Sequence, residues 1–286
     1  MKKIGVLANC RKPQACDVLK RLATKARELD LQLFTLGDTA GALPGAQRIR
    51  NAKLPGAVDV LLALGGDGTM LRAIRMLEDS DTPVLGVNLG SLGFMTSVTQ
   101  ENLEHALEMM ARGSFTISER AMAACHVFRG KKKVTQCRGL NDVVIGWGSS
   151  SRIVSLELSI NQEPVTSFNC DGLIVSTPTG STGHSLSAGG AILHPETPAF
   201  VISPICPHTL SNRPIVIPDS SLISVLVAEA QKELILAIDG QEEILLKKGD
   251  RLEISRSPHA ARFIHLPGYS YFSVLRQKLH WRGSSV

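Results

Sequence analysis

Aromatic side chains are scarce in this chain, and it contains no long apolar run. Phe, Trp and Tyr make up 4% of the 286 residues, which leaves few rings for stacking on nucleic-acid bases. The net charge of +5 is mild, and the only dense basic run is Lys131-Lys132-Lys133. No segment approaches the roughly 20 apolar residues that cross a bilayer. We therefore expect neither a nucleic-acid partner nor a membrane partner.

The cysteines lack the spacing of a metal site. The six residues show neither the short pairs that hold zinc nor the density of a disulfide scaffold. Buried, reduced thiols are the expected state, which is typical of a reducing compartment. The apolar stretch after Met1-Lys2-Lys3 is too short for a signal peptide and predicts a first strand instead. The expected location is the cytoplasm.

The first part of the chain alternates strands with helices. Apolar runs predict strands at Lys3–Ala8, Leu31–Leu36, Val58–Leu64 and Pro83–Asn88. Helical spacing predicts helices at Cys16–Leu29, Thr69–Leu77 and Glu101–Arg112. This alternation predicts an α/β domain with a parallel sheet over residues 1–114. Ligands bind such sheets at the carboxyl ends of the strands.

The pattern changes after this domain. Short β-type runs separated by turns follow, at Val143–Ile145, Ile153–Ile160, Gly172–Val175, Leu222–Val227, Leu234–Ile238, Ile244–Leu246 and Leu252–Ile254. Residues 115–268 are therefore predicted to form a second, β-rich domain. The mixed segment at 269–286 is expected to pack back on the first domain.

A glycine-rich turn, Gly65-Gly66-Asp67-Gly68-Thr69, stands between a predicted strand and a predicted helix. Strand, glycine-rich turn and helix together form a cradle for phosphate. A carboxylate at the centre of such a turn repels phosphate, so Asp67 is expected to face a hydroxyl or a metal ion. The alternative is a tight turn in which Asp67 caps the helix.

A second polar stretch runs from Asp171 to Gly190. Seven Ser or Thr residues lie between Ser176 and Ser187, and four glycines lie between Gly180 and Gly190. Such a stretch offers neutral donors and acceptors and close backbone approach, which suit a polyhydroxylated ligand that carries phosphate. A long polar surface loop is the alternative.

Together these motifs resemble the NAD kinase family, in its ATP- or polyphosphate-dependent bacterial form. The long block in its order after Asn141-Asp142 is the specific part of the resemblance, because lipid kinases and phosphofructokinases carry turns like Gly65–Thr69. The matching segments are Gly65–Thr69, Gly86–Phe94, Leu140–Val143, Asp171–Gly190, Ser203–Pro214 and Asp239–Gln241.

The resemblance implies an α/β first domain, a β-sandwich-like dinucleotide-binding second domain and an active site between them. It implies phosphoryl transfer from ATP or polyphosphate to the 2′-hydroxyl of the adenosine ribose of NAD, giving NADP. It also implies a homodimer or homotetramer. By position, Asp67 would be catalytic and engage the attacking hydroxyl. The substrate-binding residues would be Gly68, Arg72, Asn141, Asp142, Arg152, Asn169, Asp171, Thr182, Gly183, His184, Ser185, Ser187 and Gln241.

Two positions depart from the family pattern. Gly183-His184 stands where Ala-Tyr is common, and histidine offers a smaller ring for stacking on a base. Asp142 stands where glutamate is common and keeps the carboxylate on a shorter stem. The first change is the one feature that favours a nucleotide-binding sensor without turnover.

The chain shows neither a Walker-type Gly-Lys-Ser/Thr loop nor a metal-ligand cage. A divalent cofactor, Mg²⁺ or Mn²⁺, is therefore expected to arrive with the nucleotide phosphates. A lipid or sugar kinase is the alternative enzyme. It would have an apolar cavity or sugar-phosphate-binding arginines in place of the hydroxyl-rich block.

Overall fold

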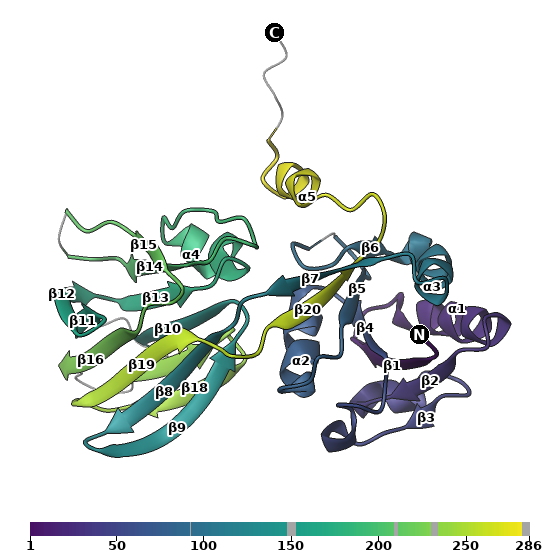
Figure 1. Ribbon diagram of the computed structural model, residues 1–286, viewed down its shortest axis with the longest axis horizontal. Helices are drawn as coiled ribbons and strands as arrows, with labels where there is room; N and C mark the ends of the chain where they lie inside the picture. The colour runs from purple at the N-terminus through teal and green to yellow at the C-terminus, as the bar shows by residue number, and fades with distance from the viewer. Residues whose placement is uncertain (92, 148–152, 209–210, 230–233, 282–286) are drawn as a thin grey trace, which may run out of the picture. The chain divides into compact units, whose positions relative to one another are not determined.

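The computed structural model describes residues 1–91, 93–147, 153–208, 211–229 and 234–281. The chain forms two compact units, one of Met1–Glu119 with Ala261–Val286 and one of Arg120–Ala260. The first unit is built on a mostly parallel sheet and the second on antiparallel sheets (Figure 1). The predicted fold class, an α/β domain with a β-rich second domain, is confirmed.

The first unit contains a sheet of eight strands in the described part of the chain. Its strands are β1 (Lys3–Ala8), β2 (Gln32–Thr35), β3 (Gln47–Arg48), β4 (Val60–Gly65), β5 (Val84–Asn88), β6 (Val98–Thr99), β7 (Thr116–Arg120) and β20 (Ala261–His265). They lie in the order β3-β2-β1-β4-β5-β20-β7, and β6 also pairs with β5. Because β1, β4 and β5 run parallel, their carboxyl ends meet at one edge of the sheet.

Helices cover both faces of this sheet. They are α1 (Ala15–Glu28), α2 (Asp67–Leu77) and α3 (Leu103–Ala111). A further helix, α5 (Tyr271–Lys278), follows β20 near the C-terminus. Side chains of α1 and α3 share one core with Val60, Leu62 and Leu64 of β4. Because successive strand residues point to opposite faces, the side chains of Leu61 and Ala63 lie on the other face of the sheet, which α2 covers. A strand buried on both sides therefore reads as a continuous apolar run.

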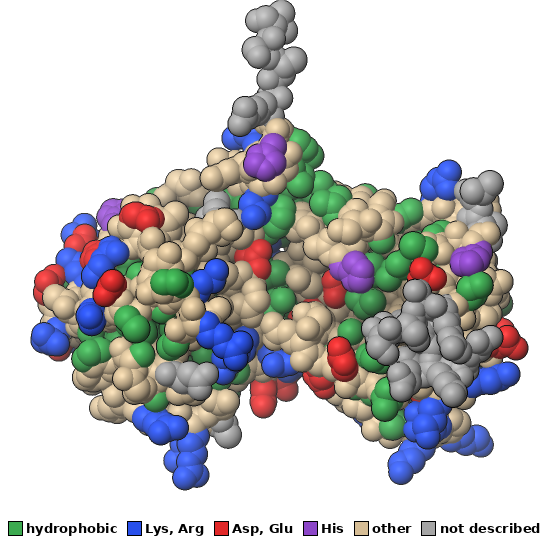
Figure 2. Space-filling model, turned by 180° about the vertical axis from the view of Figure 1, so that it is seen from behind, with side chains coloured by type: hydrophobic (Ala, Val, Ile, Leu, Met, Phe, Trp, Pro, Cys, Tyr) green, Lys and Arg blue, Asp and Glu red, His purple; other side chains and the backbone are tan. Residues whose placement is uncertain are grey.

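Ion pairs join α1 to α3 on the outside of this unit. Arg21 donates two hydrogen bonds of 2.6 Å to the Glu104 carboxylate. Lys25 lies 2.6 Å from Glu108. Basic and acidic side chains are interspersed over this unit, at the left of Figure 2. These pairs are only partly buried, and ion pairs at a protein surface contribute little individually, about 0–1 kcal/mol each.

The compact units differ from the domain ranges expected from the sequence. Residues 115–119 and 261–268, expected in the second domain, belong to the first unit because β7 and β20 are strands of its sheet. Phe263 of β20 pairs with Val84 of β5. In the segment 269–286, α5 buries Val274 and Leu275 and also belongs to the first unit.

The second unit consists of two antiparallel sheets of six strands each in the described part of the chain. One has the order β15-β14-β13-β10-β17-β18, and the other has the order β12-β11-β16-β19-β8-β9. Their bounds are β8 (Ala123–Arg129), β9 (Lys132–Gly139), β10 (Asp142–Trp147), β11 (Val154–Ile160), β12 (Glu163–Cys170), β13 (Gly172–Ser176), β14 (Ala199–Ile205), β15 (Ile215–Pro218), β16 (Ile223–Glu229), β17 (Leu234–Ile238), β18 (Glu242–Leu246) and β19 (Asp250–Arg256).

The inward-facing side chains of both sheets form one apolar core. Phe168 and Phe200 are its largest members, and both are almost fully buried. Alternation of buried and exposed residues along β16 and β19 shows that one face of that sheet packs inward.

The short helix α4 (His184–Ser187) lies in the polar block after β13. No helix in the described ranges is long and apolar enough to span a membrane.

Candidate active site

The glycine-rich turn joins β4 directly to α2. Gly66 is extended and occupies the helix N-cap position, and the helix begins at Asp67. A Cβ atom at Gly65 would overlap the side chain of Thr69, so only glycine fits there. Because Gly66 holds the cap position without a side-chain bond, the interpretation of Asp67 as a helix cap is wrong.

Asp67 reaches instead to the loop that follows β5. One carboxylate oxygen accepts the N–H of Phe94 at 2.8 Å, and the other accepts the N–H of Met95 at 3.0 Å. A Cβ atom at Gly93 would overlap this carboxylate, so glycine at 93 permits the close approach. The side chain is half-buried and held in one orientation by two backbone donors.

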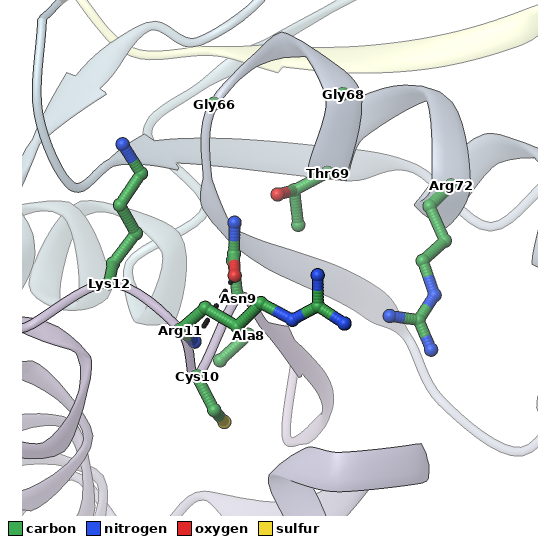
Figure 3. Close-up of a pocket in the computed structure, with 9 residues that line it drawn as sticks. All are labelled: Ala8, Asn9, Cys10, Arg11, Lys12, Gly66, Gly68, Thr69 and Arg72. Carbon is green, nitrogen blue, oxygen red and sulfur yellow. Dashed lines mark hydrogen bonds between the residues drawn. The ribbon is translucent and has the colours of Figure 1, made fainter. Parts of the chain in front are cut away.

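A pocket of about 430 Å³ lies beside this turn. It is lined by Ala8, Asn9, Cys10, Arg11, Lys12, Gly66, Gly68, Thr69 and Arg72. In Figure 3 the Arg11 side chain extends toward the guanidinium of Arg72, and Lys12 lies on the other side of Asn9. Three cationic side chains beside a helix N-terminus create a positive potential that suits a polyanion.

The sequence predicted only part of this pocket. Gly68 and Arg72 were expected near phosphate, and both line it. Asn9, Arg11 and Lys12 were missed, because an isolated basic pair after the first strand has no characteristic spacing. The available signal was their place at the carboxyl end of a parallel strand, where ligands bind.

In the second unit, Asn141 and Asp142 lie at the start of β10. The backbone carbonyl of Asn141 accepts the N–H of Thr177 at 2.9 Å. A Cβ atom at Gly180 would overlap the Asn141 backbone, which fixes the polar block against this turn. The Oδ1 atom of Asn141 is buried and has no hydrogen-bond partner in the described part of the chain. A buried unpaired acceptor is costly, so this atom is suited to a donor on a ligand.

Asp142 is a buried carboxyl group, 6% exposed. Burial, and after it the negative charge of Asp239, raise its pKa from an ordinary value of 3.8 to about 7. Loss of water disfavours the charged form, and a second carboxylate nearby adds repulsion. Asp142 can therefore change its charge near neutral pH.

The hydroxyls of the polar block divide into two groups. Ser176, Thr177, Ser181 and Ser185 are fully buried and bond within the protein, as in the 3.0 Å contact between the hydroxyls of Ser185 and Ser203. Of the predicted ligand contacts, Gly183, His184 and Ser187 are exposed and Thr182 is half-buried. Thr179 was not predicted, and its hydroxyl is buried with no partner in the described residues. The buried hydroxyls of the block therefore stabilise the fold, and its exposed residues are accessible to a ligand.

The other predicted residues lie on neighbouring elements of the same unit. Asn169 is exposed at the end of β12, and Asp171 links β12 to β13. Gln241 lies in the turn after β17, where its N–H donates to Ile238 at 2.9 Å. Arg152 lies outside the described residues. Among those that are described, no three or more His, Cys, Asp or Glu side chains form a group that could hold a metal ion.

An α/β unit with a cationic pocket at a glycine-rich turn, joined to a sandwich with a polar block, defines a two-domain nucleotide-binding phosphotransferase. Family models described as the ATP-NAD kinase N-terminal and C-terminal domains match residues 46–115 and 140–266. The NAD kinase of Syntrophotalea carbinolica is 39% identical over 282 residues, which is 98% of this chain and 99% of that protein. The chain belongs to the NAD kinase family.

Solved structures show the same fold at lower identity. A yeast NADH kinase complexed with NADH has a TM-score of 0.90 at 24% identity, covering 99% of this chain and 89% of that one. An Archaeoglobus fulgidus NAD kinase in complex with ATP has a TM-score of 0.76 at 23% identity, covering 98% and 100%. These similarities support the two-unit architecture.

Proposed function

We propose that the chain transfers the terminal phosphoryl group of ATP to the 2′-hydroxyl of the adenosine ribose of NAD, which gives NADP. The observation that carries this proposal is Asp67, which is held by two backbone donors and stands between Gly66 and Gly68, two residues that line a cationic pocket. A fixed carboxylate beside a polyanion site suits a reaction between a hydroxyl and a phosphate. Membership in the NAD kinase family indicates that the acceptor is NAD.

The donor phosphates occupy the pocket beside Gly66 and Thr69. Arg11, Lys12 and Arg72 neutralise phosphate charge, and the N-terminus of α2 adds a partial positive charge. None of the nine lining residues is acidic. These residues therefore fit phosphate oxygens, and a divalent cation would be held by the nucleotide itself, where it supplies further charge neutralisation.

The acceptor ribose is held in the second unit. Asn141 offers a buried Oδ1 without a partner, which a ribose hydroxyl can satisfy by donation. Asp142 offers a second acceptor when it is ionised. The exposed residues of the block, Gly183, His184 and Ser187, line the rest of the dinucleotide pocket. Asn169, Asp171, Arg152 and Gln241 complete it.

Asp67 engages the attacking hydroxyl. Each of its oxygens accepts one N–H, and a carboxylate oxygen has two lone pairs, so capacity for a further hydrogen bond remains. Phosphoryl transfer has a loose transition state and needs little deprotonation before attack. Orientation of the hydroxyl and late acceptance of its proton are therefore sufficient roles for Asp67.

The resemblance to the family also supports a cytoplasmic homodimer or homotetramer. Exposed apolar side chains on sheet edges support self-association, including Leu245 of β18, which is 66% exposed, and Val165 of β12. Such residues on open edges favour pairing with another chain. Sedimentation of the purified protein tests this part of the proposal.

A coupled assay for NADP formation from NAD and ATP-Mg tests the proposed reaction. The expected result is NADP formation that needs both substrates. A protein that binds NAD without turnover would be a sensor, and a sugar or lipid acceptor that outcompetes NAD would indicate a different kinase. Polyphosphate in place of ATP identifies the second donor, and NADH in place of NAD tests the acceptor preference.

A further inference from the structure

Asp239 makes an unusual set of contacts across the second unit. Its carboxylate accepts three successive backbone N–H groups, from Leu140 at 2.8 Å, Asn141 at 2.7 Å and Asp142 at 3.1 Å. The Asp239 N–H in turn donates to the Asp142 carbonyl at 3.1 Å. Successive N–H groups that converge in this way form a concave anion site, here filled by a side chain.

The turn that contains Asp239 does not by itself require this carboxylate. Asp239 and Gly240 both have positive φ, +52° and +61°, and Gln241 closes the turn with a 2.9 Å bond to Ile238. This is the backbone of a type I′ hairpin turn, in which Asn or Gly fits equally well. An aspartate also adds a negative charge next to Asp142, which is unfavourable for the fold. The carboxylate therefore acts by binding the backbone of residues 140–142, and the turn does not need it.

We propose that Asp239 is a positioning residue for the acceptor: it fixes the backbone that presents Asn141 and Asp142 to the ribose of NAD. This inference rests on the proposed function, because it takes those two side chains as ribose contacts. Asp239 itself need not touch the substrate. A Cβ atom at Gly139 would come within 3.0 Å of the Asp239 Oδ1, so the adjoining backbone is also shaped to admit the carboxylate.

The charge of Asp239 has a second effect on the same site. Opposite Asp142, β13 presents Ser176, which has no charge. Asp239 follows β17 directly and is hydrogen-bonded to the Asp142 backbone. Of the described residues, Asp239 is the charged group that adds to burial in raising the Asp142 pKa to about 7. An ionised carboxylate accepts hydroxyl donors with both oxygens, so kcat/KM for NAD should rise as the pH passes through this value.

Two variants separate positioning from charge. Asp239→Ala removes all three acceptor bonds. Asp239→Asn tolerates the positive φ and retains one carbonyl oxygen toward Asn141 and Asp142, but it removes the charge. Asp250→Asn is the matched control. Asp250 is also buried and accepts a backbone N–H, from Lys247 at 2.8 Å, but it lies in the other sheet of the unit.

Steady-state kinetics with each substrate varied, together with melting temperatures, give the test. For Asp239→Ala we expect KM for NAD to rise about tenfold or more, from loss of bonds to a charged acceptor, and KM for ATP to stay within about twofold. For Asp239→Asn we expect the pH midpoint of kcat/KM for NAD to fall by about one unit. Asp250→Asn should lower the melting temperature without either change.

Three outcomes would overturn the inference. A folded Asp239→Ala variant with wild-type KM for NAD removes the positioning role, and equal increases in both KM values indicate general loss of structure. If Asp239→Ala does not fold, an unchanged KM for NAD together with an unchanged pH midpoint in Asp239→Asn overturns the inference, because that variant loses both the charge and the acceptor for Leu140. The profiles are also measured with His184→Tyr added, which removes any contribution of this side chain to the midpoint. A wild-type protein that forms no NADP contradicts the proposed function instead.

Discussion

Gly93→Ala tests whether the loop after β5 orients Asp67. The added methyl group would overlap the Asp67 carboxylate, so either the carboxylate or the loop must move. Movement breaks one or both of the bonds from Phe94 and Met95, which are 2.8 and 3.0 Å long. A hydrogen bond to a charged group contributes about 1.5–3 kcal/mol. Loss of one such bond in positioning corresponds to a fall in kcat of roughly 10- to 150-fold.

The assay is steady-state NADP formation at saturating NAD and ATP-Mg, with the melting temperature measured in parallel. Gly90→Ala is the control in the same loop, because a Cβ atom there would meet nothing closer than the Lys12 Nζ at 3.6 Å. We expect a large loss of kcat for Gly93→Ala and little change for Gly90→Ala. Wild-type kcat in a folded Gly93→Ala variant would refute the view that this loop fixes the catalytic carboxylate.

Four further substitutions test other parts of the site. Lys12→Ala or Arg72→Ala should raise KM for ATP roughly tenfold and leave KM for NAD unchanged, because both residues line the phosphate pocket. An equal effect on both substrates would contradict this placement. His184→Tyr should lower KM for NAD by about two- to tenfold through a larger stacking ring, and an unchanged KM argues against base contact at 184. Asp142→Asn should remove a pH dependence of stability. With its pKa raised to about 7, the carboxyl favours folding fully below about pH 4, and this contribution is lost as the pH rises toward 7. Urea unfolding across this range shows it as a difference of a few kcal/mol between wild type and variant, and parallel curves would contradict the assigned burial.

The sequence predicts elements whose signal is local. The run before Gly65 and the helical spacing after Thr69 place β4 and α2 within two residues of their observed bounds. A buried parallel strand is apolar throughout, and an amphipathic helix repeats with its own period, so each is recognisable without its partners. The motif residues Asn141 and Asp142 were found only through their resemblance to a family.

Long-range pairing accounts for what was missed. β20 lies beside β5 although Phe263 and Val84 are far apart in sequence, and nothing local indicates that pairing. Asp239 contacts backbone groups 97 to 99 residues earlier in the chain, whereas its local sequence, Asp-Gly, predicts only a hairpin turn. The role of Arg11 and Lys12 is recognisable only in the folded structure, where they follow β1 and line the pocket.

The most direct test of the central claim is single-turnover NADP formation by Asp67→Asn, with NAD binding measured on the same protein. Asparagine keeps one acceptor oxygen for the loop but cannot take the proton of the ribose hydroxyl. If Asp67 engages that hydroxyl, the single-turnover rate falls by roughly 10²- to 10⁴-fold, while the Kd for NAD is unchanged. A near-normal rate with normal binding would remove Asp67 from the mechanism.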